Sequence, residues 1–309
     1  MTQAIEIRSV SKMFGTHQAV DDVSLDVPEG SIYGFIGPNG SGKTTTIRMI
    51  MNIILPDRGD ITVLGERSRG AARDDVSYLP EERGLYKQMP VRRLLRYYGR
   101  LKGRRPRDLD PVITQWLETL GLTAWADKRI DTLSKGMAQK VQFIAAVVSQ
   151  PKLLILDEPF SGLDPVNAES LRDAVLNLRR HGTTIVFSTH DMSAAERICD
   201  RIFMIFKGRK VLDGSLDAIQ AEYGHDTIRL RLGQGVGALA GLPEIEAIND
   251  HGNHQDVRLK SDPQAFLQKL VQRTTVLQFE IAKPSLHDIF IRIARPTTDD
   301  LQATGEGAR

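Results

Sequence analysis

The sequence is poor in cysteine, in net charge and in long apolar runs, and each shortage excludes a class of protein. Cys199 is the only cysteine among 309 residues, so the chain can form neither an internal disulfide nor a cysteine metal site. Lysine and arginine number 41 against 39 acidic residues, and the net charge of +2 is too small to indicate nucleic-acid binding through bulk charge. No apolar run approaches the roughly 20 residues that span a bilayer, and no N-terminal segment has the pattern of a secretory signal. We therefore expect any role at a membrane to be peripheral.

What is present is an ordinary globular composition on a long chain. The hydrophobic share of 41% and the charged share of 26% are typical of soluble folded proteins. Because 309 residues exceed the usual size of one compact domain, the length predicts two domains, each with its own core.

The first part of the chain predicts an α/β domain over residues 1–224. Strand-like segments alternate with helical ones, and the strands begin near Ile5, Val23, Ser31, Leu153, Thr183 and Arg201. Between the third and fourth of these strands the apolar residues take up a helical period, which predicts an inserted helical subdomain at about 83–145.

The remaining chain predicts a small α+β accessory domain over residues 225–297. Strand-like segments alternate there with a helix at 262–273 and a last helix at 285–294, an order that resembles a ferredoxin-like split βαβ domain. Asp262 and Pro263 are a good helix start, because the aspartate caps free amides and the proline needs no donor there. The polar segment 298–309 is expected to be a flexible tail.

A phosphate-binding loop is predicted where the third strand meets the helix that follows it. The pattern GxxxxGKT is formed by Gly37, Pro38, Asn39, Gly40, Ser41, Gly42, Lys43 and Thr44, with Thr45 directly after it. The glycines let consecutive amides point at phosphate oxygens in front of the helix N-terminus. Lys43 is predicted to reach the β and γ phosphates and Thr44 to ligate Mg²⁺.

Two carboxylates follow the strand LLIL that begins at Leu153. Asp157 and Glu158 lie at the carboxyl end of this strand, the edge where α/β sheets bind ligands. Asp157 is placed to hold Mg²⁺, and Glu158 to orient or deprotonate a water that attacks the γ-phosphate. An acidic turn that only caps the strand is the alternative interpretation.

The order of these motifs resembles the ABC ATPase family over roughly the first 220 residues. Further matching segments are LSKGMAQK from Leu133, SGLD from Ser161 and STH from Ser188. The resemblance implies a P-loop ABC ATPase core with an inserted helical subdomain, whose cofactors are ATP and Mg²⁺. It also implies a head-to-tail homodimer in which the LSKGM segment of one chain closes over the ATP of the other.

The resemblance assigns further roles residue by residue. Ser134 and the amide of Gly136 match the contacts to the γ-phosphate across the dimer, and His190 matches the switch histidine. Asp164 matches a residue that communicates between the subunits. Phe14 lies where the family has an aromatic that stacks on adenine, although a core phenylalanine near a strand end is a competing interpretation.

Three residues depart from the family pattern. Glu81 stands where glutamine is usual, in the loop that senses Mg²⁺ and the transport partner. This carboxylate can still ligate the cation, but it would raise the proton affinity of Asp157 and Glu158 unless Mg²⁺ is bound. Lys135 and Met137 replace glycine and glutamine; Lys135 either adds charge near the phosphates or points to solvent.

The function implied by the resemblance is that of the ATP-hydrolysing subunit of a transporter, working with a separate membrane permease at the cytoplasmic face of the membrane. The C-terminal segment PSLHDIFI from Pro284 resembles an extension found in the ATPases of sodium- and drug-exporting systems, so export is expected. No nucleic-acid partner is expected.

Two other functions stay open. A soluble regulatory ATPase that acts on a ribosome or a nucleic acid is suggested by the arginine-rich segment 91–107, which could also face anionic lipid or only solvent. A degenerate module that changes shape with little hydrolysis is suggested by Glu81 and the altered LSKGM segment. The accessory domain could likewise only stabilise a dimer.

Overall fold

The computed structural model describes residues 2–67, 74–82, 84–223 and 227–294. Its contacts divide the chain into two compact units, with the boundary between Gly214 and Ser215. We call these the first and the second unit and describe each by itself.

The first unit contains a four-stranded antiparallel sheet of order β2-β1-β4-β5. Its strands are β1 (Gln3–Phe14), β2 (His17–Pro28), β4 (Arg58–Val63) and β5 (Glu66–Arg67). The two long strands form a hairpin in which Phe14 pairs with His17, so the aromatic ring of Phe14 lies at the tip of the sheet.

A six-stranded sheet of order β10-β9-β3-β8-β7-β6 forms the centre of the first unit. Its strands are β3 (Ile32–Ile36), β6 (Val76–Leu79), β7 (Leu153–Asp157), β8 (Thr184–Thr189), β9 (Arg201–Phe206) and β10 (Arg209–Ser215). The five strands from β9 to β6 pair in parallel, and β3, β7 and β8 are buried throughout. Their near-continuous apolar runs are typical of parallel strands covered on both faces. The parallel pairing brings the carboxyl ends of these strands to one edge of the sheet.

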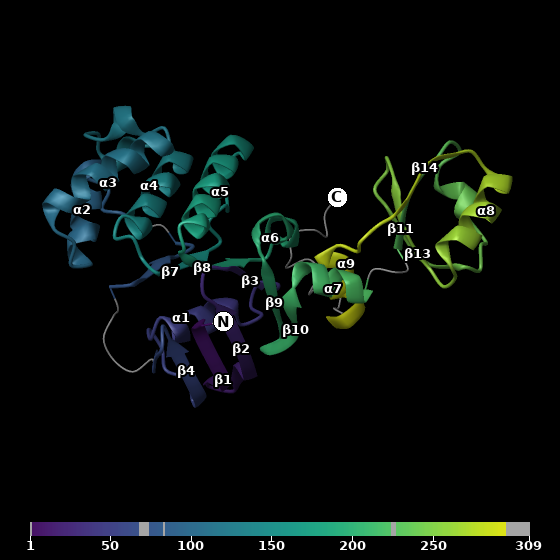
Figure 1. The fold of residues 1–309 in the computed structure, drawn as a ribbon, viewed down its shortest axis with the longest axis horizontal. Coiled ribbons are helices and arrows are strands. Elements are labelled where there is room, and N and C mark those ends of the chain that lie inside the picture. The colour runs from purple at the N-terminus through teal and green to yellow at the C-terminus, as the bar shows by residue number, and fades with distance from the viewer. Residues whose placement is uncertain (1, 68–73, 83, 224–226, 295–309) are drawn as a thin grey trace. The chain divides into compact units, whose positions relative to one another are not determined.

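A single hydrophobic core joins the two sheets to helix α1 (Lys43–Ile50). Its buried members come from both sheets and from α1, and include Ile5, Val23, Phe35, Ile47, Ile155 and Phe203. Figure 1 shows α1 beside the antiparallel sheet, on the side of the central sheet opposite to the large helices. The core therefore fixes α1, and with it the loop that precedes it, against the central sheet.

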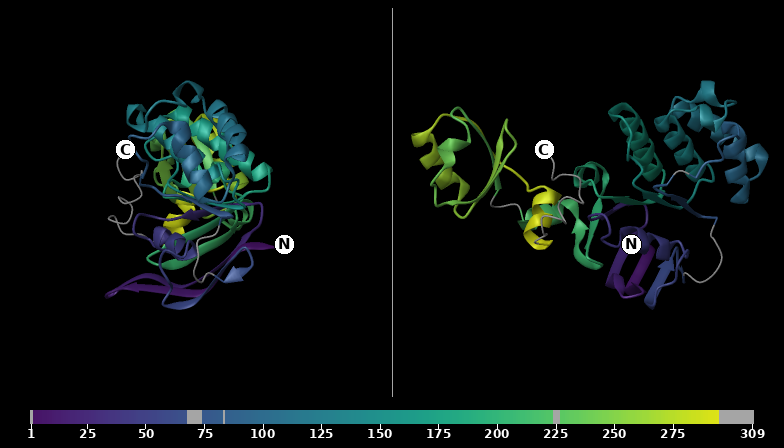
Figure 2. Two further views of the ribbon diagram at one scale, coloured as in Figure 1. Left: turned by 90° about the vertical axis from the view of Figure 1, so that its left-hand side faces the viewer. Right: turned by 180° about the vertical axis from the view of Figure 1, so that it is seen from behind.

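The predicted helical insertion is present and consists of three helices. They are α2 (Val91–Leu101), α3 (Pro106–Thr119) and α4 (Lys135–Val147), with short turns η1 (Thr123–Trp125) and η2 (Ile130–Thr132). Helices α5 (Pro165–Arg180) and α6 (Met192–Ile198) then provide the crossovers after β7 and β8. In the views of Figures 1 and 2 the helices α2 to α5 gather on one side of the central sheet.

Several arginines of the basic segment 91–107 are paired with other groups of the same chain. Arg96 makes a two-point ion pair with Asp110, with nitrogen–oxygen distances of 2.6 and 2.9 Å. Arg104 donates to the carbonyl of Ser149 at 2.7 Å, and Arg92 donates to the hydroxyl of Thr114 at 3.1 Å. Part of the charge that suggested a nucleic-acid surface is therefore paired with groups of the same chain.

The second unit is a four-stranded antiparallel sheet covered by a helix. Its elements are α7 (Leu216–Tyr223), β11 (Thr227–Leu232), η3 (Val236–Leu239), β12 (Ile245–Asp250), β13 (Gln255–Leu259), α8 (Pro263–Arg273), β14 (Val276–Ile281) and α9 (Leu286–Ala294). The strand order β12-β13-β11-β14 is that of a ferredoxin-like domain, with η3 where the first helix would be. Phe266 and Leu270 of α8 pack on the buried side chains of the sheet. Figure 1 and the right view of Figure 2 show α8 against this sheet.

Local signals set the bounds of these elements in the second unit. Asp262 caps α8 by accepting a hydrogen bond from the amide of Ala265 at 2.9 Å, as its place before Pro263 predicted. Helix α7 belongs to the second unit, because Gln220 donates to the carbonyl of Pro284 at 3.3 Å and Arg292 donates to that of Tyr223 at 3.0 Å.

The division by contacts therefore falls before α7, whereas the sequence placed the boundary at 224. The predicted tail 298–309 lies outside the described residues. Within the part of the chain that the structure describes, no helix is both long enough and apolar enough to cross a bilayer.

Candidate functional site

The predicted phosphate loop links β3 to α1 through tightly packed glycines. Gly42 precedes the helix with φ of 112°, and a Cβ there would lie 2.5 Å from the carbonyl oxygen of Ala19. The amide of Ser41 donates to the carbonyl of Pro38 at 3.2 Å, which curls the loop. The buried hydroxyl of Ser41 has no hydrogen-bond partner among the described residues. A curled loop with an unpaired buried donor fits an anionic ligand in front of the helix.

The side chain of Lys43 lies within this loop. Its ammonium group donates to the carbonyl oxygens of Gly37 at 2.6 Å and Pro38 at 3.0 Å. Burial lowers the pKa of Lys43, and the nearby carboxylates of Glu158 and Asp157 oppose that shift. A buried cation held by loop carbonyls is suited to bind phosphate oxygens, which would exchange neutral acceptors for charged ones.

Asp157 ends β7 and is buried beside the loop. Thr44 donates its hydroxyl to Oδ2 of Asp157 at 3.4 Å, and Tyr78 donates to the same oxygen at 3.3 Å. Burial is the largest cause that raises the pKa of Asp157. A carboxylate and a hydroxyl oxygen side by side are hard ligands that fit Mg²⁺, and a bound cation would offset the cost of burying the charge.

Glu158 follows Asp157 with a backbone φ of 49°, which is unusual for a residue with a side chain. Its Oε1 accepts hydrogen bonds from the backbone amide of His190 at 2.8 Å and from Nδ1 of the same residue at 2.6 Å. Its Oε2 accepts from the hydroxyl of Thr189 at 3.0 Å. The end of β8 therefore holds this carboxylate in one orientation, as a general base requires.

We expect the His190 imidazole to titrate above the ordinary value of about 6.5, because its hydrogen bond to Glu158 raises its pKa. A raised folded-state pKa means that the pair stabilises the fold fully below pH of about 6.5, and that this contribution is lost as pH rises through the folded-state value. NMR titration of the imidazole signals should show the raised pKa in the wild type and a lower one in Glu158→Gln. A His190 pKa at or below the ordinary value would contradict the pairing.

Most of these groups line one cavity of about 400 Å³, whereas the predicted residues Gly37, Pro38, Ser41 and His190 do not line it. It is lined by Phe14, His17, Ala19, Asn39, Gly40, Gly42, Lys43, Thr44, Thr45, Glu81, Asp157 and Glu158. Phe14 is 49% exposed and has the ammonium of Lys12 at 5.7 Å from its ring centroid, so it is not a core residue. The structure thus brings the predicted loop, both carboxylates, Glu81 and an exposed aromatic ring to a single space.

The LSKGM residues lie elsewhere. Ser134 caps α4 by accepting from the amide of Met137 at 3.2 Å, and Asp164 caps α5 by accepting from the amide of Asn167 at 3.0 Å. Gly136 packs against Asn167, where a Cβ would lie 2.9 Å from the side-chain nitrogen. Gly136 and Asp164 both contact Asn167, and neither they nor Ser134 line the cavity that holds Lys43.

Three residues near the cavity were not predicted as functional. Tyr78 and Thr189 bind the two carboxylates, and both lie in segments that the motifs pointed to, YLPEERG and STH. Gln142 of α4 donates to the carbonyls of Pro80 at 3.3 Å and Glu82 at 3.1 Å, so it binds the loop backbone on both sides of Glu81. No sequence signal marked Gln142, because the contact joins segments that are far apart in the chain.

Comparison with known proteins agrees with this geometry. Residues 20–161 match the family described as ABC transporter, and residues 214–294 match the C-terminal domain of the DrrA1-3-like ATP-binding proteins. An uncharacterized ABC transporter ATP-binding protein of Bacillus subtilis, YhaQ, is 39% identical over 93% of this chain and 97% of its own length. The Nod factor export ATP-binding protein I of a Rhizobium species is 35% identical over 94% of this chain and 96% of its own.

Among solved structures, an ATP-binding subunit of an ABC transporter superposes with a TM-score of 0.67. It is 31% identical in sequence, and the match covers 72% of this chain and 94% of that one. These three proteins are matched over nearly their whole length, and the phosphate loop and both carboxylates of this chain line one cavity. The chain therefore belongs to the ATP-binding subunits of ABC transporters and is an ATPase.

Proposed function

We propose that two copies of this chain bind two ATP molecules with Mg²⁺ head to tail, and that their closure drives export through a separate membrane permease. The observation that carries the proposal is the separation of two half-sites. Lys43, Asp157 and Glu158 line one cavity, while Ser134 and Gly136 lie in another part of the same unit. A second copy can bring the missing half to each cavity, as a two-fold symmetric pair requires.

Each residue of the cavity has a defined task in this proposal. The loop amides and Lys43 hold the phosphates, and Phe14 stacks on the adenine. Thr44 and Asp157, with Glu81, would hold Mg²⁺, which neutralises charge on the phosphate oxygens. Glu158 takes the proton of the attacking water, and His190 contacts the γ-phosphate from the end of β8.

An apolar groove near the Glu81 loop supports coupling to a permease. The groove has a volume of about 450 Å³ and is lined by residues of β6, of the loop that follows it, and of α2 and α4. Leu101 lines it and is 61% exposed. The nearby Tyr86 is 52% exposed and lies edge-on to Tyr97 at 5.7 Å between ring centroids. Exposed aromatic and apolar side chains of this kind mark protein interfaces.

The groove is linked to the cavity through Gln142. This side chain lines the groove and also holds the backbone on both sides of Glu81, which lines the nucleotide cavity. A partner helix that enters the groove would therefore move with the Glu81 loop. This link is a route by which closure over ATP can reach the permease.

Export and a location at the cytoplasmic face of the membrane are the remaining parts of the proposal. The relatives named as Nod factor export proteins and the DrrA1-3-like match over residues 214–294 support the direction. We expect no nucleic-acid partner, since Arg96 and Arg104 are paired with groups of the same chain and the net charge is only +2.

The test is purification of the Glu158→Gln protein from detergent-solubilised host membranes with ATP and Mg²⁺, followed by identification of what co-purifies. We expect a multi-spanning membrane protein, whose recovery falls strongly with an added Leu101→Ser. Val271→Ser is the matched control, because Val271 is an exposed apolar residue (60%) on α8 of the second unit. Recovery of ribosomes or nucleic acid in place of a membrane protein would overturn the permease proposal.

Glu81 leads to a separate expectation about Mg²⁺. A unit charge about 4 Å away is worth about 1 kcal/mol in water, so the extra carboxylate changes the affinity for a cation or a proton about fivefold. Without Mg²⁺ this carboxylate repels the phosphate oxygens, whereas with Mg²⁺ it attracts the cation. Removing free Mg²⁺ should for this reason reduce ATP hydrolysis about fivefold more in the wild type than in Glu81→Gln. Glu82→Gln, which removes the neighbouring exposed charge, is the control. Equal Mg²⁺ dependence in the wild type and Glu81→Gln would refute a role for this carboxylate.

A further inference from the structure

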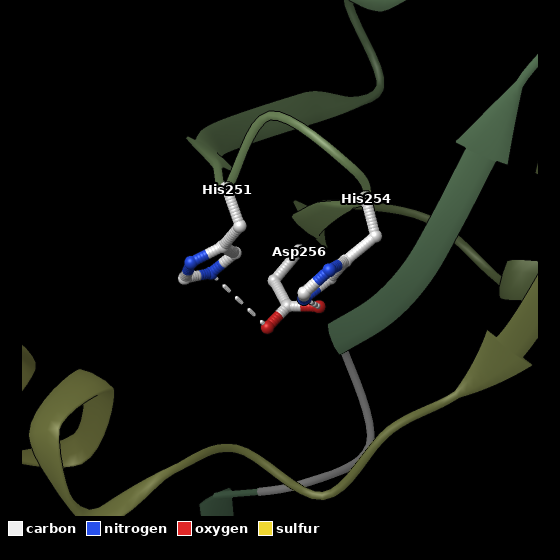
Figure 3. A group of neighbouring side chains, drawn as sticks. All are labelled: His251, His254 and Asp256. Carbon is white, nitrogen blue, oxygen red and sulfur yellow. Dashed lines mark ion pairs between the residues drawn. The ribbon is translucent and has the colours of Figure 1, made fainter.

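Two histidines and an aspartate gather at the hairpin between β12 and β13 of the second unit. His251, His254 and Asp256 each offer one ligand atom, and these atoms lie within 4.8 Å of one another. Figure 3 shows both imidazole rings turned toward the Asp256 carboxylate. The Nε2 atom of His251 is 3.6 Å from Oδ2, and that of His254 is 4.0 Å from Oδ1. Both distances are too long for a hydrogen bond but near the spacing of neighbouring ligands around one small cation.

A hydrogen bond within the hairpin directs a lone pair of His254 toward the Asp256 carboxylate. Nδ1 of His254 lies 2.7 Å from Oδ1 of Asn253, which can only accept, so the ring proton is on Nδ1. The Nε2 atom of His254 then carries a lone pair that faces the carboxylate. Metal-binding histidines are commonly set in this tautomer by a hydrogen bond from the other ring nitrogen.

The hairpin is also held in shape without a ligand. Asp250 accepts from the amide of Gly252 and from the side chain of Gln255, both at 2.9 Å, and His251 and His254 are joined by a backbone hydrogen bond of 3.0 Å. The two imidazole rings stack with centroids 4.7 Å apart. The ligand atoms are therefore arranged in advance, which lowers the entropy cost of binding.

Arg229 opposes a cation but also orients the carboxylate. Its guanidinium donates to Oδ1 of Asp256 at 2.8 Å and to Oδ2 at 3.0 Å. A carboxylate has about four lone-pair sites, so each oxygen keeps one for another partner. The positive charge of Arg229 lowers the affinity of the group for a metal cation. The two hydrogen bonds from its guanidinium group also fix the plane of the Asp256 carboxylate, which the histidines face.

We propose that His251, His254 and Asp256 form a binding site for a divalent transition metal such as Zn²⁺. Imidazole nitrogens with one carboxylate are ligands that suit Zn²⁺, Ni²⁺ and Cu²⁺, and they are poor ligands for Mg²⁺. Three protein ligands leave the fourth tetrahedral position for water. The site is independent of the nucleotide cavity, because its residues all belong to the second unit.

The test is calorimetric titration of the untagged full-length protein with ZnCl₂, in the absence of nucleotide. We expect the His251→Ala/His254→Ala protein to bind one Zn²⁺ fewer per chain than the wild type. His181→Ala removes an exposed histidine of the first unit and should bind as the wild type does. Asn253→Ala keeps all three ligands but frees the His254 ring, and should weaken binding about 10-fold or more.

Thermal unfolding gives a second readout. Zn²⁺ should raise the unfolding temperature of the wild type and of His181→Ala, and leave that of the double variant unchanged, because a ligand of the native state stabilises it. Equal Zn²⁺ stoichiometry in the wild type and the double variant would overturn the proposal, as would a wild type that binds no Zn²⁺.

Discussion

A Glu158→Gln protein is expected to hydrolyse ATP about 10²- to 10⁴-fold more slowly than the wild type, the range that a positioned general base contributes. Glutamine has the shape of glutamate, and its single carbonyl oxygen can still accept from the amide of His190, which binds Oε1 of Glu158 at 2.8 Å, while its amide nitrogen can donate to the hydroxyl of Thr189, 3.0 Å from Oε2. It cannot take up a proton from water. The loss should therefore fall on the chemical step, with ATP binding by the phosphate loop retained.

Single-turnover hydrolysis and ATP binding, measured on the same preparation, separate the two effects. Glu118→Gln makes the same change of charge at an exposed position of α3 and should turn over ATP as the wild type does. If turnover of Glu158→Gln stays within about twofold of the wild type, Glu158 does not act as the base, and the degenerate module with little hydrolysis becomes the favoured interpretation.

The motifs that were predicted well are those in which neighbours in sequence are also neighbours in space. The phosphate loop depends on glycines at fixed positions before one helix, and the Asp262 cap depends on the four consecutive positions from Asp262 to Ala265. Both features join residues that are close together in the sequence, so the sequence pattern alone is enough to predict them. The carboxyl end of β7 was likewise identifiable from its apolar run followed by Asp157 and Glu158.

Contacts between distant segments were out of reach for the same reason. The pairing of β7 with β8 puts Asp157 opposite Ser188 and brings Glu158 to His190. The amino-acid sequence does not specify which strands of the sheet are adjacent. Gln142 reaches the Glu81 loop from a helix about 60 residues away, and α7 joins the second unit through contacts with Pro284 and Arg292. The histidines of the β12–β13 hairpin matched no motif in the sequence. The metal-binding proposal for them depends on the direction in which the two imidazole rings point.

Mixing two inactive variants should restore hydrolysis if the active site is shared between two chains. Lys43→Ala removes the buried cation that lies within the phosphate loop. Ser134→Arg places a bulky cation at the N-terminus of α4, where the exposed Ser134 hydroxyl now caps the helix. Each variant alone should lose nearly all turnover, but Ser134→Arg should still bind ATP as a monomer, because Ser134 does not line its own cavity.

In a mixture, half of the dimers combine one chain of each kind, and each such dimer has one intact site out of two. Turnover should therefore return to about a quarter of the wild-type value per chain if the sites act independently. Ser134→Thr keeps the hydroxyl and the helix cap and should be nearly as active as the wild type, which separates the loss of the contact from misfolding of α4. A Ser134→Arg protein that no longer binds ATP by itself, and that mixing does not rescue, would place Ser134 in the site of its own chain and rule out the head-to-tail arrangement. Rescue by mixing would instead mean that neither chain completes an active site alone, so ATP hydrolysis requires the closed dimer.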